Sequence, residues 1–349
     1  MEEDKQPEEA FTPLDQIGEF PLIDRLVKGF PLIQGSSLLG IGDDAAAVEH
    51  LSGPTLVSTD MLVEGVHFDL TYVPPQHLGY KAAIVNFSDI YAMNGKPTQL
   101  TMNLAISNRF GVEFLEGIYA GLRAACEEHE VDLVGGDTTS SYSGLILSGT
   151  ILGEVETGEL VKRNGARPTD LVVVSGDLGG AYMGLQLLER EKSVFKENPD
   201  MQPELKGNEY VLKRQLRPEA RRDVIETLSG LEVQPTSMID ISDGLSSELL
   251  HLCKSSQTGV HIYEENIPID PSVYKLCEEF ELTTTTVALN GGEDYELLFT
   301  ISIHDHEKIK ANPNFTVIGH MTDPAEGRNM VTRDNKLIPL QAQGWQAGW

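Results

Sequence analysis

The residues that could do chemistry are acids that recur at the ends of apolar segments. Asp43 and Asp44 stand side by side in a glycine-flanked turn. Like charges on adjacent residues repel by roughly 1 kcal/mol in water, and by more in a partly buried site, unless a cation lies between them. Further acids end strand-like runs or glycine turns: Asp60, Asp89, Asp137, Asp240, Asp243, Glu293 and Asp294. We interpret the chain as a scaffold that brings these acids to one place.

The acids and their hydroxyl neighbours are typical ligands of a hard cation. Mg²⁺ prefers oxygen ligands in near-octahedral geometry, keeps several waters and is often shared with phosphates. Ser58, Thr59 and Asp60 offer two hydroxyls and a carboxylate in three consecutive residues. Several acids around several Mg²⁺ ions therefore indicate polyphosphate chemistry. The sequence has no P-loop, no G-x-G-x-x-G after a strand and no protein-kinase motif set, so a nucleotide would bind in a site of another type.

Each of these residues also has a structural interpretation. Asp243 could be a helix N-cap, and the glycine pairs before Asp137 and Glu293 could supply positive φ angles. His67 alone is typical of a hydrogen-bonded loop histidine. Asp89, late in an expected helix, is unfavourable for the helix dipole, which favours a functional role. The combination of five acid-bearing segments favours one shared site over several separate structural roles.

Composition limits the class of protein. The 349 residues carry a net charge of −28, which argues against a nucleic-acid binder but not against a Mg-nucleotide ligand. The sequence contains no run of about 18 apolar residues, so we expect no membrane helix. The polar N-terminus does not resemble a signal peptide. The three cysteines, Cys126, Cys253 and Cys277, are odd in number and lack metal-ligand spacing. They fit a reducing compartment, so we expect a cytoplasmic protein.

Apolar periodicity predicts alternating strands and helices, so the fold class is α/β (α+β). We expect a disordered acidic tail over 1–16, an N-terminal domain over 17–157 and a C-terminal domain over 158–349. The segment 191–209 is expected to be a surface insertion, and the tail 320–349 to be rich in loops. Strands are expected at 55–60, 100–106, 133–137, 145–155, 170–176, 237–242, 260–263, 295–303 and 316–319. Helices are expected at 17–30, 78–92, 111–129, 209–216, 218–229, from 243 onward, 271–280 and 304–310.

Seven motifs follow one another along the chain in a specific order and spacing. They are GIGDDAAAV, STDMLVEGVHF, NFSDIYAMNGKP, LVGGDTTS, VKRNGARPTD, IDISDGLSSEL and NGGEDYELLFT. Each motif is weak alone, and seven in register are specific. From about residue 17 to the C-terminal tail, the chain resembles the thiamine-monophosphate kinase family, of the aminoimidazole ribonucleotide synthetase-like superfamily of ATP-binding enzymes.

The resemblance implies two α/β domains, a homodimer formed through the N-terminal sheet, and a second domain that covers the nucleotide cleft. It also implies the roles of individual residues. Asp43, Asp60 and Asp137 would take part in catalysis. The implied Mg²⁺ ligands are Asp44, Ser58, Thr59, Asp60, Asp89, Asp137, Asp240 and Asp243. The implied ATP contacts are Gly136, Asp137, Arg163 and Ser242, and the implied substrate contacts are His67, Glu293 and Trp345, with Trp349 as the alternative aromatic residue.

The activity that the resemblance implies is ATP-dependent phosphorylation of thiamine monophosphate to thiamine diphosphate by direct in-line transfer. A phosphate acceptor has a second pKa near 6 and needs no general base. Two alternatives stay open. Another ATP-using enzyme of the superfamily is one, such as a selenophosphate synthetase, a hydrogenase-maturation dehydratase or a purine-pathway synthetase; the first usually carries an N-terminal Cys or Sec, and here no Cys precedes Cys126. The other is a non-catalytic Mg-nucleotide or Ca²⁺ module, although the D-x-[DN]-x-[DN]-G pattern is absent.

Overall fold

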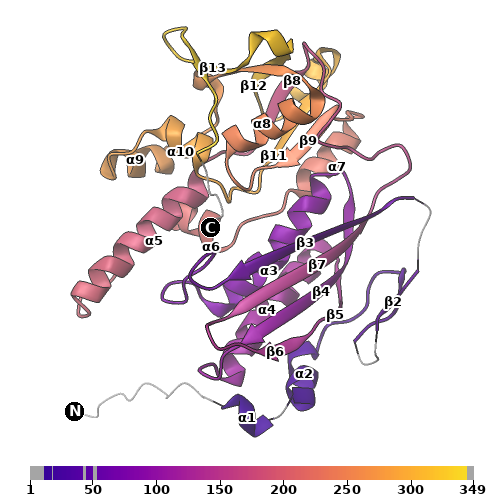
Figure 1. Ribbon diagram of the computed structural model, residues 1–349, viewed down its shortest axis with the longest axis vertical. Coiled ribbons are helices and arrows are strands. Elements are labelled where there is room, and N and C mark those ends of the chain that lie inside the picture. Colours follow the sequence, from indigo (N-terminus) through magenta and orange to yellow (C-terminus); the bar gives the residue numbers. More distant parts are fainter. Residues whose placement is uncertain (1–11, 18, 42–44, 50–52, 344–349) are drawn as a thin grey trace. The chain divides into compact units, whose positions relative to one another are not determined.

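The computed structural model describes residues 12–17, 19–41, 45–49 and 53–343 (Figure 1). It divides into two compact units, each built from non-consecutive segments. The first unit comprises residues 1–50, 59–83 and 98–150, and the second comprises 51–58, 84–97 and 151–349. The domain boundary expected after residue 157 stays a prediction. None of the helices in the described ranges is long and apolar enough to cross a membrane.

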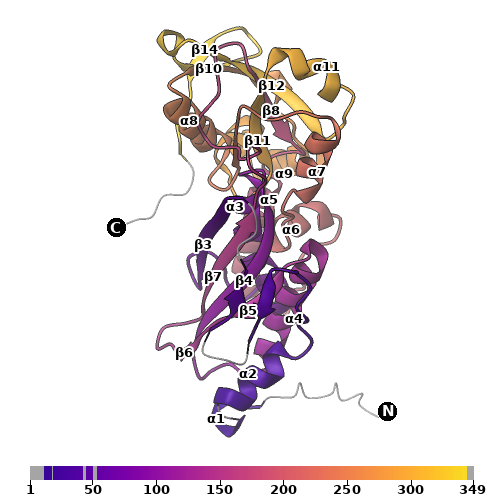
Figure 2. The ribbon, with the colours of Figure 1, turned by 90° about the vertical axis from the view of Figure 1, so that its right-hand side faces the viewer.

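A five-stranded sheet forms the centre of the first unit, and α4 lies against one of its faces (Figure 2). The strands follow the order β3-β7-β4-β5, and β6 pairs with β4. β4 runs parallel to β5 and to β6. The elements are β3 (Thr55–Val63), β4 (Lys96–Ile106), β5 (Asp132–Gly135), β6 (Thr138–Ser140), β7 (Ile146–Glu154), α3 (Pro75–Tyr91) and α4 (Val112–His129). Four of them continue into the second unit, to which residues 55–58 of β3, 84–91 of α3, 96–97 of β4 and 151–154 of β7 belong.

Glycines let α3 and α4 approach closely. A Cβ atom on Gly79 of α3 would lie 1.9 Å from the carbonyl oxygen of Ile118, and one on Gly121 of α4 would lie 1.9 Å from that of Gln76. Any side chain at either position would force the helices apart. The first unit also contains α1 (Leu14–Ile17), α2 (Glu19–Val27), β1 (Ser37–Leu39) and β2 (Ala47–Val48).

A seven-stranded sheet organises the second unit, in the order β14-β13-β10-β12-β8-β11-β9. Strands β12, β8 and β11 and the edge strand β9 pair antiparallel in that order, whereas β10 and β13 are parallel to each other. Alternate residues point to opposite faces of a strand, and both faces are buried here. The strands are β8 (Leu171–Ser175), β9 (Ser237–Asp240), β10 (Gly259–Tyr263), β11 (Leu297–Ile301), β12 (Phe315–Thr322), β13 (Arg328–Val331) and β14 (Leu337–Pro339).

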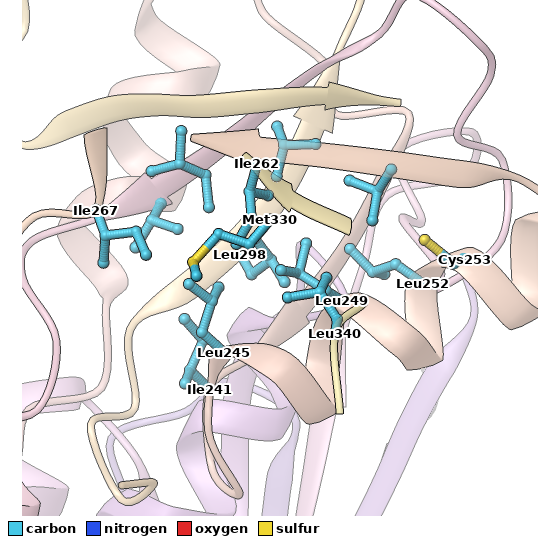
Figure 3. Packing of buried hydrophobic residues seen from close by; sticks show 14 of the residues in the cluster. Ile241, Leu245, Leu249, Leu252, Cys253, Ile262, Ile267, Leu298, Met330 and Leu340 are labelled. Atoms are coloured by element: carbon cyan, nitrogen blue, oxygen red, sulfur yellow. The ribbon is translucent and has the colours of Figure 1, made fainter. Parts of the chain in front are cut away.

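Helix α8 (Leu245–Ser256) covers one face of this sheet. Leu245, Leu249 and Leu252 follow a helical repeat that places them on one stripe, and all three are fully buried. In Figure 3 these side chains point toward the strands that carry Ile262 and Leu298. The sequence therefore forms α8 because its apolar stripe matches the apolar face of the sheet.

The opposite face of the same sheet is covered by α7 (Arg222–Gly230). Val224 and Leu228 of this helix pack with Met238 and Phe299 of the sheet in a second apolar cluster. A third cluster joins α5, α6, α9 and α10. The remaining elements of the unit are α5 (Gly180–Glu197), α6 (Glu209–Leu216), α9 (Pro271–Glu279), α10 (Thr284–Asn290), α11 (His306–Ile309) and the short 3₁₀ helices Glu264–Asn266, Ile303–Asp305 and Pro324–Glu326.

The expected fold class is confirmed, with differences at several elements. The backbone N–H of Thr12 donates to Glu113 at 2.8 Å and α1 begins at Leu14, so the expected disordered tail does not extend over residues 12–16. The expected insertion at 191–209 is wrong over its first part, because α5 continues to Glu197 and Glu191 is buried. The tail is more ordered than expected, since it forms β13 and β14.

Candidate active site

A cavity of about 630 Å³ lies within the second unit, and four of the predicted site residues line it. Apolar side chains form one part of its wall, and acids, hydroxyls and cations form another. Ser58, Asp89, Arg163 and Asp240 are the predicted residues in the lining. The other lining residues are Leu56, Val57, Ile90, Ala92, Met93, Lys162, Asn164, Met238, Ile239 and Ser255.

Asp89 is held at this cavity by a strand residue. Its carboxylate accepts a hydrogen bond of 2.5 Å from the hydroxyl of Ser58. Asp89 lies in the last turn of α3, as the sequence predicted. A carboxylate in the last turn opposes the helix dipole, and α3 has no basic residue there to offset it. The position is therefore unfavourable for the helix alone and favours a role at the cavity.

Asp240 lies at the end of β9 and is only 4% exposed. Its carboxylate accepts a hydrogen bond of 2.7 Å from the hydroxyl of Ser88. Ser88 and Asp89 are neighbours on α3, so this helix contributes to both contacts. The two carboxylates at the cavity thus share one arrangement, in which each accepts from a serine hydroxyl.

Two cations, Lys162 and Arg163, and the amide of Asn164 come from the segment before β8. This segment is held from both sides. The backbone carbonyl of Lys162 accepts from the N–H of Met238 at 3.1 Å, and that of Arg163 accepts from the hydroxyl of Ser256 at 3.3 Å. Both cationic side chains are exposed. They form a positively charged edge next to the two carboxylates.

The loop between β9 and α8 carries Ser242 and Asp243, and Glu248 holds its backbone. One carboxylate oxygen of Glu248 accepts from the N–H of Asp243 at 2.8 Å and from that of Ser242 at 3.3 Å. Burial raises the pKa of Glu248 to about 7, and the Asp243 carboxylate adds to this rise. Glu248 was not among the predicted site residues. The available signal was its place in the first turn of a helix, six residues after Ser242 and five after Asp243.

The interpretation of Asp243 as a helix N-cap is wrong. Gly244 occupies the N-cap position of α8, and no side chain caps the helix there. Asp243 is half-buried, and burial raises the pKa of its carboxyl, while the charges of His251 and Arg163 oppose this rise. Its carboxylate therefore makes no capping hydrogen bond to α8.

The first unit carries the remaining described candidates of the N-terminal motifs. Asp60 lies half-buried in β3, and the hydroxyl of Thr59 donates to the carbonyl of Gly149 at 2.6 Å. Gly136 is needed for close approach and not for a positive φ, because a Cβ there would lie 2.1 Å from the carbonyl oxygen of Met102. Asp137 follows it with an exposed side chain, and its carbonyl accepts from Leu104 at 2.8 Å.

The predicted substrate contacts have ordinary local partners. His67 accepts a hydrogen bond at Nδ1 from the N–H of Val63 at 3.1 Å, as a loop histidine would. Glu293 accepts from the amide nitrogen of Gln215 at 3.0 Å. Glycine before Glu293 does supply a positive φ, at Gly292. Asp43, Asp44, Trp345 and Trp349 lie outside the described residues.

The donor set at the cavity fits a hard cation. The described residues contain no group of three or more His, Cys, Asp and Glu side chains that could hold a metal ion. Mg²⁺ does not require such a group, because it is commonly bound by one or two carboxylates together with water and substrate phosphates. Asp89 and Asp240, with the hydroxyl of Ser58, supply that kind of oxygen set.

Comparisons with known proteins agree with this architecture. Residues 42–155 match the family model of the N-terminal domain of AIR synthase related proteins. A solved structure of the hydrogenase maturation protein HypE in complex with ATP shares the fold, with a TM-score of 0.72 over 93% of this chain and 95% of that one, at 21% identity. The chain thus contains an N-terminal domain that matches the AIR synthase-related class over residues 42–155, and it shares its fold with HypE.

Closer relatives identify the family within this class. The thiamine-monophosphate kinase of Aquifex aeolicus is 36% identical over 335 residues, which cover 95% of this chain and 99% of the relative. The structure of AaThiL complexed with AMPPCP and TMP is 34% identical, with a TM-score of 0.71 over 95% of this chain and 97% of that one. The chain belongs to the thiamine-monophosphate kinase family.

Proposed function

We propose that this protein transfers the γ-phosphoryl group of ATP to the phosphate of thiamine monophosphate, which yields thiamine diphosphate and ADP. The observation that carries the proposal is similarity to thiamine-monophosphate kinases over nearly the whole chain. One such relative is complexed with AMPPCP, a non-hydrolysable analogue of ATP, and with TMP. The cavity in the second unit, with its carboxylates and cations, has the chemistry that a polyphosphate requires.

Mg²⁺ would be held by Asp89 and Asp240, and it would supply positive charge that offsets the repulsion between the phosphates of donor and acceptor. Serine hydroxyls hold both carboxylates at the cavity. Ser58 donates to Asp89 at 2.5 Å, and Ser88 donates to Asp240 at 2.7 Å. Ligands that are already oriented reduce the reorganisation needed when the nucleotide enters. The sequence-based assignments of Asp44, Ser58, Thr59, Asp60, Asp137 and Asp243 as Mg²⁺ ligands stay proposals, as does the catalytic role of Asp43.

Lys162 and Arg163 would contact the phosphate chain at the edge of the cavity. Arg is suited to phosphate because its guanidinium can donate two parallel hydrogen bonds, whereas Lys acts as a point charge. No side chain needs to act as a general base, since the acceptor phosphate is already largely ionised at pH 7. The protein then contributes mainly by holding donor and acceptor in line and by compensating charge.

A coupled assay of ADP formation with ATP, MgCl₂ and thiamine monophosphate tests this function, and detection of thiamine diphosphate by chromatography confirms the product. Free thiamine is the control acceptor, because it lacks the ionised phosphate oxygen. We expect turnover with thiamine monophosphate and none with thiamine. Turnover with thiamine alone would contradict the assigned acceptor, and ADP formation without any acceptor would indicate only an ATPase.

The alternative activity is that of another ATP-using enzyme of the same superfamily, such as the hydrogenase-maturation type. The solved structure of that type, HypE, is 21% identical to this chain, and a similarity at that level shows a shared fold alone. The two activities are distinguished by the same assay, because the alternative predicts that thiamine monophosphate does not stimulate ADP formation.

The homodimer is likewise a proposal. Strand β3 leaves alternate residues uncovered, and among them Val57 is 65% exposed and Met61 is 54% exposed. Apolar residues on one face of a strand need a cover, and the family resemblance predicts a second copy. Light scattering at micromolar concentration should give twice the mass of the chain, and Met61→Lys should shift the mass toward one chain. A cytoplasmic location stays a prediction from the sequence.

A further inference from the structure

The loop 291–296, between α10 and β11, has an unusual backbone. Gly292, Glu293 and Tyr295 have φ angles of 71°, 57° and 52°. Residues other than glycine rarely adopt positive φ, and they do so mainly where surrounding contacts fix the conformation. Two such residues close to Gly292, namely Glu293 and Tyr295, mean that this loop depends on contacts from elsewhere in the fold.

Arg214 of α6 provides several of those contacts. Its guanidinium donates to the carboxylate of Glu296 at 2.7 Å and to the carbonyl of Asp294 at 3.2 Å, and it lies 3.5 Å from the Asp294 carboxylate. It also donates to the carbonyl of Asp177 at 3.0 Å. Next to it on the helix, Gln215 donates to Glu293 at 3.0 Å. Two consecutive residues of α6 therefore hold three residues of the loop.

The charges in this contact region balance. Glu296 also accepts from Arg221 and, at 2.5 Å, from the hydroxyl of Ser175. The side chains of Asp294 and Glu296 are each 1% exposed, and that of Arg214 is 14% exposed. Burial works to lower the pKa of Arg214, but the charges of Glu296 and Asp294 outweigh it and raise the pKa. Two buried carboxylates thus face two arginines, and no buried charge is left over among these four residues.

The loop in turn holds the strand end that carries a cavity residue. The N–H of Glu293 donates to the carbonyl of Ser242 at 2.7 Å, and that of Tyr295 donates to the carbonyl of Ile241 at 2.9 Å. The N–H of Ile241 donates back to the carbonyl of Glu296 at 2.8 Å. Ile241 directly follows Asp240, whose carboxylate lines the cavity. Hydrogen bonds therefore link α6 to the loop and the loop to Ile241 and Ser242, and the peptide bond links Ile241 to Asp240.

We propose that Arg214 is a positioning residue, which fixes the segment Asp240–Asp243 at the cavity by bracing the loop 291–296. Arg214 is not among the residues that line the cavity, and it acts through the backbone of the loop. The inference gives α6 a role that no sequence motif indicated. Its effect on turnover rests on the proposed kinase function, whereas its effect on the backbone does not.

The experiment compares Arg214→Lys, which keeps the charge and loses the two-pronged contact, with Lys213→Met as the matched control. Lys213 is the preceding residue of α6 and forms an exposed ion pair with Glu219 at 2.5 Å, away from the loop. Glu296→Gln is a second variant that keeps the shape of the side chain and removes its charge. Each protein is measured by amide hydrogen exchange without ligands, by thermal melting, and by kinase assay with ATP and thiamine monophosphate.

We expect Arg214→Lys and Glu296→Gln to exchange faster at the amides of residues 241 and 293–295 and to lower kcat by about tenfold or more. The Lys213→Met control should change neither quantity. Exchange at wild-type rates in both variants would overturn the inference, as would wild-type kcat together with faster exchange. If the wild type itself shows no kinase activity, the proposed function fails, and the exchange measurement still decides whether Arg214 fixes the segment.

Discussion

Two pairs of carboxylates in the second unit have opposite surroundings. Asp89 and Asp240 line the cavity and accept hydrogen bonds from serine hydroxyls. Asp294 and Glu296 lie away from the cavity lining and contact guanidinium groups. Asp89, Asp240 and Asp294 follow the same sequence theme, an acid at the end of an apolar run or in a glycine turn, yet their partners differ in charge.

The difference separates acids that can serve a ligand from acids that support the fold. A hydroxyl orients a carboxylate without neutralising it, so the carboxylate keeps its charge for a cation. A buried arginine neutralises a carboxylate, and removing one partner of such a pair typically costs 3–5 kcal/mol because a charge is left without compensation. We therefore expect mutations at the first pair to affect activity directly, and mutations at the second pair to affect stability and, through the loop 291–296, activity to a smaller extent.

The largest expected effect is on stability, at the arginine-paired group. Arg214→Met should lower the free energy of unfolding of the ligand-free protein by about 3–5 kcal/mol, because the buried Asp294 loses its nearby cation. Urea denaturation followed by circular dichroism measures the change. Lys213→Met serves as the control, with an expected change within about 0.5 kcal/mol. Equal changes in both variants would remove the distinction between the two pairs of acids.

The second prediction concerns pH and Glu248, which is 2% exposed. Burial raises its pKa from 4.5 in the unfolded chain to about 7 in the folded protein. The folded state therefore binds the proton more tightly, and this contribution to stability is present below pH 4.5 and is lost as pH rises to 7. Glu248→Gln keeps the acceptor oxygen and cannot titrate. Relative to wild type, it should gain about 3 kcal/mol of stability between these pH values.

Denaturation curves of wild type and Glu248→Gln at both ends of this pH range, in metal-free buffer, provide the measurement. The useful quantity is the change in their difference, because other groups titrate in both proteins and cancel. A difference that stays constant with pH would show that Glu248 is ionised at its ordinary pKa, and that its surroundings stabilise the charge instead of opposing it.

The third prediction concerns the hydroxyl-paired group. Asp240→Asn should lower kcat/KM by about 100-fold or more, a barrier increase of about 2.7 kcal/mol, because the cavity loses a charged ligand. The asparagine oxygen can still accept from Ser88, so the metal-free protein should unfold within about 1 kcal/mol of wild type. Steady-state kinetics and urea denaturation measure both. An Asp240→Asn variant that is active but strongly destabilised would reverse its classification.

Asp60→Asn and Asp137→Asn, in the first unit, extend the same prediction. Both should lose most activity and keep the thermal stability of the metal-free protein, since removing one carboxylate from a group of metal-binding acids relieves repulsion. A large fall in melting temperature in both variants would instead favour a structural role for these acids.

The smallest expected effect is at His67. Its contact with the N–H of Val63 is a neutral hydrogen bond, and a phosphate acceptor needs no general base. His67→Asn should therefore raise the KM for thiamine monophosphate and leave kcat within about tenfold, or 1.4 kcal/mol. Initial rates over a range of substrate concentrations separate the two constants. A thousandfold loss of kcat at unchanged KM would assign His67 a role in proton transfer.

Much of the fold could be predicted from the sequence, because local periodicity determines it. The helix expected at 209–216 is α6 with the same bounds, and the apolar stripe of Leu245, Leu249 and Leu252 forms the buried side of α8. The family could also be predicted, because seven motifs lie in register. Element ends were less certain: β11 ends at Ile301, two residues before the expected end, because pairing with β8 and β9 stops there.

The sequence by itself determined the seven motifs and predicted which residues would carry the chemistry, and the tertiary structure decided which of them share surroundings. It placed Asp89 late in a helix and Asp240 at a strand end, but their partners Ser58 and Ser88 became known only from the fold. Arg214 and Glu296, 82 residues apart, had no local signal at all. Helix and strand patterns arise from interactions between near neighbours in the chain. The charge that a carboxylate faces depends on residues that folding brings together from distant segments. Only the structure therefore separates the acids that line the cavity from those that contact arginine.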